Sequence, residues 1–398
     1  MREIRVTLSD GLGAASWPTV YRSRMDKRVV YISGSHANAL MRVARREKAL
    51  AAIPYEDSCI MPLDESVHTA ADLHIDGILE MIGVDESHPL ELLVPNDASR
   101  RWATSLQTSV MSAPLPPNAF LELKPGKSAR DRIALPKETL ILCESPALAI
   151  VRGARHLQQL VAREQMSRHV ATLRLLEFAD ECCGYYARDP ENPRTGDIHY
   201  DKPGTCTRFL APKDLRLFLD EARNVDGLSL ARLVSKYVID GTGSPMETYV
   251  NHGLTLPPRL GGLSMREPLA NEQLRVSDEV RKELKHRSIR PDLQWPELRM
   301  LAEYLGDKDH SAKKARIEDK DRMQDYAKAQ FTAFQLMFDD VRSAAALGRT
   351  AQMLAREMMR RGVRGELYRV RRVLGDENFA TRQATLIATL LPPVTHYE

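Results

Sequence analysis

Two acidic residues in the last third of the chain have the types and spacing of a metal site. Asp292 follows a proline, which disfavours helix for the residue before it, so segment 288–295 is predicted to be extended. The Trp-Pro-Glu-Leu sequence at 295–298 predicts a turn. The apolar run 298–306 predicts a second strand, with Glu303 as its polar exception. Neighbouring strands would then hold two carboxylates side by side.

The position of Glu303 in that strand indicates that its charge needs compensation. Strand geometry puts its side chain on the same face as Leu301 and Leu305, where an ionised carboxylate is poorly solvated. A divalent cation shared with Asp292 would compensate it, and hard oxygen ligands suit Mg²⁺, or Mn²⁺ in its place. Such an ion serves phosphodiester hydrolysis. Two structural alternatives stay open: a buried Arg or Lys paired with Glu303, or contact of Glu303 with water at the sheet end.

Short strings around this acidic pair occur in a characteristic order. They are Gly243-Ser-Pro-Met-Glu-Thr248, Leu254-Thr-Leu-Pro-Pro258, Gly261-Gly262-Leu263, Asp292, Ala302-Glu-Tyr304, His310 and Asp319-x-x-Arg322. Over residues 240–345 this order resembles the very-short-patch-repair-like branch of the PD-(D/E)xK endonuclease superfamily. The preceding segment, from 181 to the paired helices, has a weaker similarity to abortive-infection antitoxin regulators. The resemblance implies a restriction-endonuclease-like core, a small mixed sheet flanked by helices.

The resemblance also implies roles for individual residues. Glu247 would lie on the first helix of the core and face the metal as a third acidic ligand, beside Asp292 and Glu303 as the two metal-binding carboxylates. His310 would act as general acid or position a water. The remaining residues assigned on this basis are Arg322 and Lys308 as DNA contacts, and Asp319 and Tyr304 as supporting residues.

One position departs from the superfamily pattern. Leu305 stands where a lysine commonly follows the second acidic residue, and leucine can neither bind metal nor orient water. Either Lys308 or His310 supplies the polar group, or the scaffold has lost catalysis. The sequence therefore leaves three functions open. They are a Mg²⁺-dependent DNA endonuclease of host defence or repair, an inactive DNA-binding regulator of a defence or toxin–antitoxin system, and a scaffold that contacts a partner protein.

Several of these residues have structural explanations as well. Ser244, a proline and Glu247 form the pattern of a capping box, so Glu247 either caps a helix or serves catalysis. His310 is explained equally by a loop. Between 308 and 328 charges alternate, which is typical of a solvated helix face that would include Asp319 and Arg322.

The C-terminal residues are rich in arginine. Nine arginines and no lysine lie between Asp340 and Asp376, against four acidic residues. The planar guanidinium suits phosphate groups, so this stretch predicts a DNA contact, with Arg360 and Arg361 as candidates. Pairing of these arginines with acidic patches of the protein itself is the alternative.

The composition limits the class of protein to which the chain can belong. The chain has 398 residues, 43% hydrophobic and 28% charged, with net charge +3. These values indicate a soluble globular protein of two or three domains that permits nucleic acid as a partner. No apolar run suits a membrane span and the N-terminus lacks a secretory core, so a cytoplasmic location is expected. Five cysteines without paired Cys-x-x-Cys spacing argue against disulfides and zinc.

Alternating patterns predict an α/β (α+β) fold with an N-terminal mixed α/β domain. The predicted strands are 28–33, 89–95, 119–123, 139–143, 272–276 and 331–337, besides the two around the acidic pair. The predicted helices are 35–51, 96–110, 146–163, 169–183, two within 210–238, and two that begin at Ser244 and Ser311. The predicted sections are an irregular lead-in 1–27, an N-terminal domain 28–205, connecting helices 206–240, an endonuclease-like core 241–345 and basic C-terminal helices 346–398.

Overall fold

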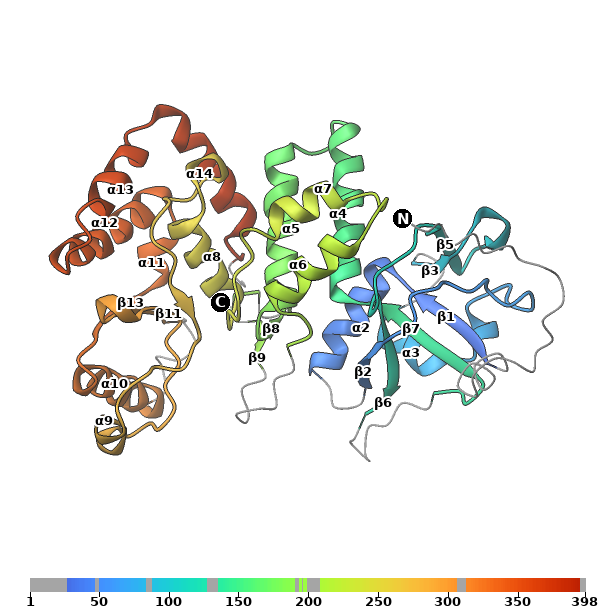
Figure 1. Cartoon of the computed structure of the whole chain (residues 1–398), viewed down its shortest axis with the longest axis horizontal. Helices are drawn as coiled ribbons and strands as arrows, with labels where there is room; N and C mark the ends of the chain where they lie inside the picture. Colours follow the sequence, from blue (N-terminus) through green and yellow to red (C-terminus); the bar gives the residue numbers. More distant parts are fainter. Residues whose placement is uncertain are drawn as a thin grey trace, which may run out of the picture.

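The structure, a computed structural model, describes residues 27–46, 50–83, 88–126, 135–189, 193–194, 196–198, 208–305 and 313–393, and for 46, 197–198 and 313–319 the backbone only. The fold is mixed α/β with two mixed sheets, which confirms the predicted class. Three sections follow one another along the long axis: an N-terminal sheet, a group of helices, and a C-terminal section with the smaller sheet (Figure 1). The predicted lead-in lies outside the described residues, apart from Lys27.

The N-terminal sheet has seven strands in the order β2-β6-β7-β1-β3-β5-β4. Strands β1 and β7 are parallel, as are β3 and β5, and the other neighbours are antiparallel. Their aliphatic side chains form a core beneath helix α2, because the central strands are apolar on both faces. The bounds are β1 Arg28–Ile32, β2 Leu50–Tyr55, β3 Leu90–Val94, β4 Trp102–Ala103, β5 Leu106–Val110, β6 Phe120–Pro125 and β7 Thr139–Glu144.

The helix predicted over 96–110 is wrong. Asn96 does act as a cap, since its side chain accepts a hydrogen bond from Ser99 N, but it caps only a single 3-10 turn. The chain then forms β4 and β5, and β5 extends the sheet by pairing parallel to β3. Leu106 of β5 is buried and Gln107 is exposed, and the other three residues of the strand are half-buried.

Helices make up the middle section. Ser145 caps α4 and Gly184 follows the last residue of α5, which agrees with the helices predicted over 146–163 and 169–183; the cap of α5 is Ser167. Helix α4 packs against α5, α6 and α7. The bounds are α4 Pro146–Ala162, α5 Arg168–Cys183, α6 Pro212–Glu221 and α7 Leu228–Val234, with α2 Gly34–Arg46 and α3 Asp76–Met81 nearer the N-terminus.

A buried contact between an aspartate and a histidine joins the middle section to the C-terminal section. Asp180 on α5 and His252 on α8 are both fully buried, with His252 Nε2 at 2.5 Å from Asp180 Oδ2. Asp180 also accepts a hydrogen bond from Ile239 N at 2.8 Å. Burial raises the pKa of Asp180, and the adjacent His252 opposes that rise.

The smaller sheet has the order β10-β11-β12-β13. Strands β10, β11 and β12 are antiparallel neighbours, and β13 returns parallel to β12 after helix α10. The strand predicted at 272–276 is wrong, because the chain pairs with β11 earlier, at β10. The bounds are α8 Pro245–Thr255, β10 Leu269–Ala270, α9 Asp278–Glu283, β11 Leu293–Trp295, β12 Met300–Tyr304, α10 Lys313–Lys328 and β13 Thr332–Leu336.

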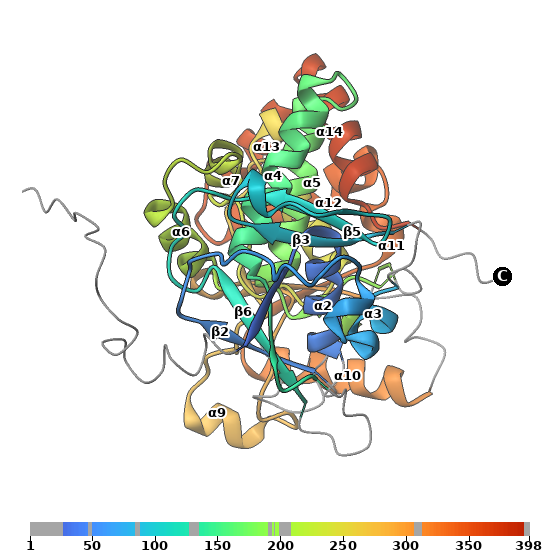
Figure 2. The ribbon, with the colours of Figure 1, turned by 90° about the vertical axis from the view of Figure 1, so that its right-hand side faces the viewer.

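Four further helices complete the C-terminal section. Figures 1 and 2 place α13 and α14 at the opposite end of this section from α9 and α10. Helix α14 packs against both α5 and α8, so the last helix of the described chain also contacts the middle section. The bounds are α11 Phe338–Val341, α12 Ala344–Arg360, α13 Glu366–Leu374 and α14 Glu377–Leu390.

One large hydrophobic core extends from the N-terminal sheet through the middle helices into the C-terminal section. It includes Leu142 of β7, Leu176 of α5 and Trp295 of β11, all nearly inaccessible to solvent. A smaller core packs the other face of β12 against α10 through Leu301 and Tyr326. Within the described part of the chain, no helix is both long and apolar enough to cross a membrane.

Candidate functional site

Glu247 is fixed by the first turn of α8. Ser244 Oγ accepts a hydrogen bond from Glu247 N at 3.1 Å, and Pro245 occupies the first helical position. The Glu247 carboxylate turns back and accepts hydrogen bonds from Gly243 N at 2.7 Å and from Asn271 Nδ2 at 2.5 Å. Ser244 thus caps the helix, but Glu247 accepts from Gly243 N rather than from the N–H of Ser244, so the reciprocal half of the capping box is not formed. The same carboxylate faces the end of the small sheet.

Strand pairing brings Asp292 and Glu303 together. Leu293 pairs with Ala302 in the antiparallel ladder, so Asp292 and Glu303 face each other one step further along. Asp292 N donates to Glu303 Oε2 at 3.3 Å, and Tyr304 N donates to Asp292 Oδ2 at 2.7 Å. The supporting role expected of Tyr304 thus comes from its backbone. Glu247, Asp292 and Glu303 are called the acid cluster below.

Helix α10 covers Glu303 from the other side. The side chain of Glu303 is 4% exposed, and its Oε1 accepts a hydrogen bond from the Tyr326 hydroxyl. Arg322, one helical turn before Tyr326, places Nη1 at 3.6 Å from the same oxygen and is about half exposed. Arg322 was expected to contact DNA, and in this structure it pairs with Glu303. The sequence alternative of an arginine beside Glu303 is therefore partly realised.

The cluster carries more negative charge than its neighbours offset. Burial raises the pKa of Glu247, and the charge of Glu303 adds to this rise. Burial also raises the pKa of Asp292 well above its usual value, together with the charges of Glu247 and Glu303. Among the described residues the three carboxylates form a single ion pair, that of Arg322 with Glu303. Such a cluster must bind either protons or a cation.

The donor types fit a hard divalent cation. Three carboxylates supply oxygen ligands only, which is the set that Mg²⁺ and Mn²⁺ prefer. As the side chains stand, no group of three or more His, Cys, Asp or Glu in the described residues has the geometry of a metal site. The carboxylates of Glu247 and Asp292 instead accept hydrogen bonds from Asn271 and from backbone N–H groups. Side-chain rotation would therefore have to accompany ion binding.

The remaining predicted site residues lie apart from the cluster or outside the described chain. His310 and Lys308 fall outside the described residues, as does the side chain of Asp319. Arg360 is 76% exposed and pairs with Glu357 at 3.2 Å. Arg360 and Arg322 are therefore the predicted DNA contacts that are exposed among the described residues.

Arg361, also a predicted DNA contact, binds groups of the protein itself. Its Nη1 donates to Leu298 O at 2.8 Å and its Nη2 to Thr332 Oγ1 at 2.7 Å, while Nε binds Glu357 at 2.8 Å. Its guanidinium therefore joins the end of α12 to the small sheet. Most of its donors are used within the protein.

Two residues of the site were not found from the sequence. Tyr326 lies one helical turn after Arg322, a spacing that could have marked it once the helix was assigned. Asn271 follows β10 with a left-handed backbone, φ +49°, and donates to Glu247. Asparagine tolerates this conformation, but no sequence pattern links it to a carboxylate elsewhere in the chain.

Comparisons of the chain with family models, with curated proteins and with solved structures gave no match.

Proposed function

We propose that the chain is a Mg²⁺-dependent DNA endonuclease, or a close relative, that hydrolyses phosphodiester bonds in host defence or repair. The supporting observation is the acid cluster: three carboxylates at one end of a mixed sheet, Glu303 buried and Glu247 and Asp292 half-buried, with a single ion pair between them and the described residues. The order of elements, with Glu247 on a helix and the other two acids on adjoining strands, agrees with the resemblance to PD-(D/E)xK nucleases. Action on DNA implies a cytoplasmic location.

In this proposal the residues of the chain divide the work. Asp292 and Glu303 hold the ion, and the Tyr304 N–H and the Tyr326 hydroxyl keep these two carboxylates oriented. Glu247, held by Asn271, is placed to accept a proton from an attacking water. When bound, Mg²⁺ lowers the pKa of a coordinated water and offsets charge that develops on the scissile phosphate.

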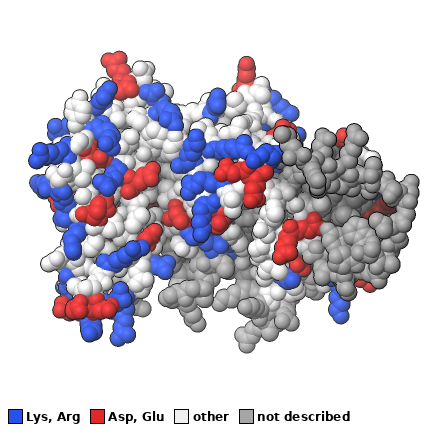
Figure 3. Space-filling view, viewed as in Figure 1, with Lys and Arg blue, Asp and Glu red and all other residues white. Residues whose placement is uncertain are grey.

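The C-terminal helices are proposed to bind the DNA backbone. Lys and Arg side chains gather on the left of Figure 3, in the region of α12 and α13. Arg371 and Arg372 are exposed and form no ion pair with the described residues, and the side chain of Tyr368 between them and Arg364 is also exposed. Arginines bind phosphates, and an exposed aromatic ring offers a surface on which a base can stack.

The test is nicking of supercoiled plasmid DNA by the full chain in Mg²⁺ or Mn²⁺, against the same reaction with chelator. Asp292→Asn, Glu303→Gln and Glu247→Gln keep the shape of each side chain and are expected to abolish nicking. Glu272→Gln is the matched control, because Glu272 is exposed beside Asn271 and only its backbone contacts the sheet. Undiminished nicking by both Asp292→Asn and Glu303→Gln would overturn the proposal.

A second candidate is an inactive DNA-binding regulator that acts with a protein partner of a defence system. Leu305 favours it, because an aliphatic side chain occupies the position next to the cluster where superfamily nucleases carry lysine. This candidate predicts salt-sensitive DNA binding without cleavage in any divalent metal. Appearance of nicking only after Leu305→Lys would support loss of catalysis in the natural chain.

A further inference from the structure

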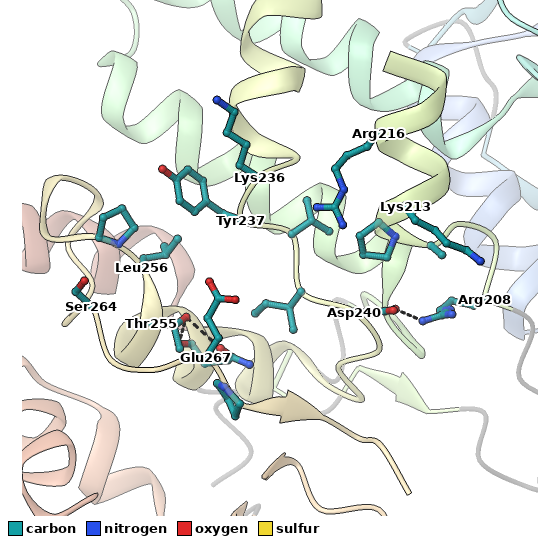
Figure 4. Close-up of a pocket in the computed structure, with 17 residues that line it drawn as sticks. Arg208, Lys213, Arg216, Lys236, Tyr237, Asp240, Thr255, Leu256, Ser264 and Glu267 are labelled. Atoms are coloured by element: carbon teal, nitrogen blue, oxygen red, sulfur yellow. Dashed lines mark hydrogen bonds and ion pairs between the residues drawn. The ribbon is translucent and has the colours of Figure 1, made fainter. Parts of the chain in front are cut away.

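A cavity of about 610 Å³ lies between helix α6, segment 236–240 and helix α8. We call it the α6–α8 cavity (Figure 4). Its charged lining residues are Arg208, Lys213, Arg216, Lys236, Asp240 and Glu267. Charged and polar residues together therefore make up most of the lining, unlike that of a pocket for an apolar small molecule.

The charges of this lining do not cancel. Arg208 and Asp240 are bound to each other. Lys213 and Lys236 are exposed and form no ion pair with any described residue. In Figure 4 the side chains of Arg216 and Glu267 point toward the centre of the cavity from opposite walls. Three basic groups thus stand against one carboxylate, so the cavity has a net positive charge.

The cavity continues the acid cluster along helix α8. Glu247 of the cluster and Asn251 and Thr255 of the cavity are spaced four residues apart, so they lie on one face of the helix. At about 1.5 Å per residue, Glu247 and Thr255 are about 12 Å apart along the axis. Two lining residues are also close in sequence to residues that contact the acid cluster: Asp240 precedes Gly243, and Glu267 precedes Asn271. Gly243 and Asn271 both donate hydrogen bonds to Glu247.

We propose that the α6–α8 cavity binds backbone phosphates of the nucleic-acid strand that is cut at the acid cluster, with Lys213, Arg216 and Lys236 as the phosphate ligands. This inference rests on the proposed function. A polyanion fits better than a single small anion, because all three basic residues are exposed and they are spread over helix α6 and segment 236–240. Glu267 opposes Arg216 and weakens phosphate binding, which favours release of the cut strand.

The experiment measures binding of a fluorescent DNA duplex to the full chain without divalent metal, over a series of salt concentrations. Lys213→Gln, Arg216→Gln and Lys236→Gln are each expected to weaken binding and to reduce the slope of log K against log salt by about one, and the triple variant by about three. Glu267→Gln is expected to tighten binding. Lys137→Gln, an exposed lysine of the N-terminal section, removes the same charge elsewhere and is the control.

The results separate this inference from the proposed function. If the triple variant kept the affinity and the salt slope of the natural chain while Asp292→Asn still lost nicking, the α6–α8 cavity would be excluded as a phosphate site. The proposed nuclease activity would stand. Absence of nicking in every metal, with weaker DNA binding by the triple variant, would exclude the nuclease activity and keep the α6–α8 cavity as a DNA-binding site. If polyglutamate competed as well as unlabelled DNA, the cavity would be a cationic surface without preference for nucleic acid. That result would also overturn the inference. Lys213→Gln and Lys236→Gln change exposed side chains only, so they test it even if Arg216→Gln does not fold.

Discussion

Binding of a divalent ion to the acid cluster should displace a proton from Asp292. An ordinary aspartate is ionised above about pH 4. Burial and the charges of Glu247 and Glu303 raise the pKa of Asp292 well above that value, so without metal this carboxyl retains its proton at higher pH. A metal ligand must be ionised, and each displaced proton makes the apparent affinity about tenfold tighter, or about 1.4 kcal/mol, per pH unit. The dependence ends where pH exceeds the pKa in the folded protein.

The assay is isothermal titration calorimetry of the full chain with Mg²⁺ and Mn²⁺, in buffers of different ionisation enthalpy, between about pH 6 and about pH 8. The difference between buffers counts the protons released. We expect one from Asp292, and a second if Glu247 also ionises, since burial raises its pKa too. Asp292→Asn should lose more affinity than the about 10- to 100-fold that loss of a supporting residue costs. Glu272→Gln should bind as the natural chain does.

An affinity that does not change with pH, or ion binding without proton release, would show that Asp292 gives up no proton to the metal. Equal metal binding by Asp292→Asn would refute the metal site itself, because the ion would then lie elsewhere. That result would leave the three carboxylates as a structural cluster that shares protons. The nicking assay alone could not make this distinction.

Three further predictions concern stability. Tyr326→Phe removes the hydroxyl that donates to Glu303 and should lower the free energy of unfolding by about 1 to 3 kcal/mol in chelator. The loss should be smaller in Mg²⁺. Equal losses in thermal melts with and without the ion would contradict a metal-binding Glu303. Gly261→Ala should cost at least about 2 kcal/mol, because Gly261 has φ +90° and a Cβ would collide with Arg382 O; an unchanged melting temperature would contradict this. Burial raises the pKa of Glu144 to about 7, so the folded chain retains a proton that the unfolded chain releases near pH 4.5. Stability should fall by up to about 1.4 kcal/mol per pH unit between those values, and urea unfolding of Glu144→Gln should lack this fall.

Local signals were enough to place the acidic pair. The proline before Asp292, the turn at 295–298 and the apolar run around Glu303 each act over a few residues, and together they predict a hairpin whose ends bring the two acids together. Ser244 and the following proline likewise fixed the start of α8, since capping depends on neighbours in sequence. These parts of the fold and site could be predicted for that reason.

Long-range partners could not be predicted in the same way. Asn271 and Tyr326 reach the cluster through the pairing of β10 with β11 and the packing of α10, neither of which follows from local spacing. The helix predicted over 96–110 failed because pairing with β3 overrode the capping signal at Asn96. Arg360 and Arg361 are identical in type and adjacent, yet packing alone decides that one is exposed and the other is bound to the sheet.

The buried pair between Asp180 and His252 has a consequence for any attempt to dissect the chain. A fragment that starts at residue 241 would keep His252 and lose helix α5 with Asp180, so the face of α8 that packs against α5 would be opened to water. His252 belongs to α8, one turn and a residue beyond Glu247. A fragment that keeps the acid cluster in place must therefore include helix α5 as well as the C-terminal sheet. A shorter fragment would retain Glu247 but would misplace its carboxylate.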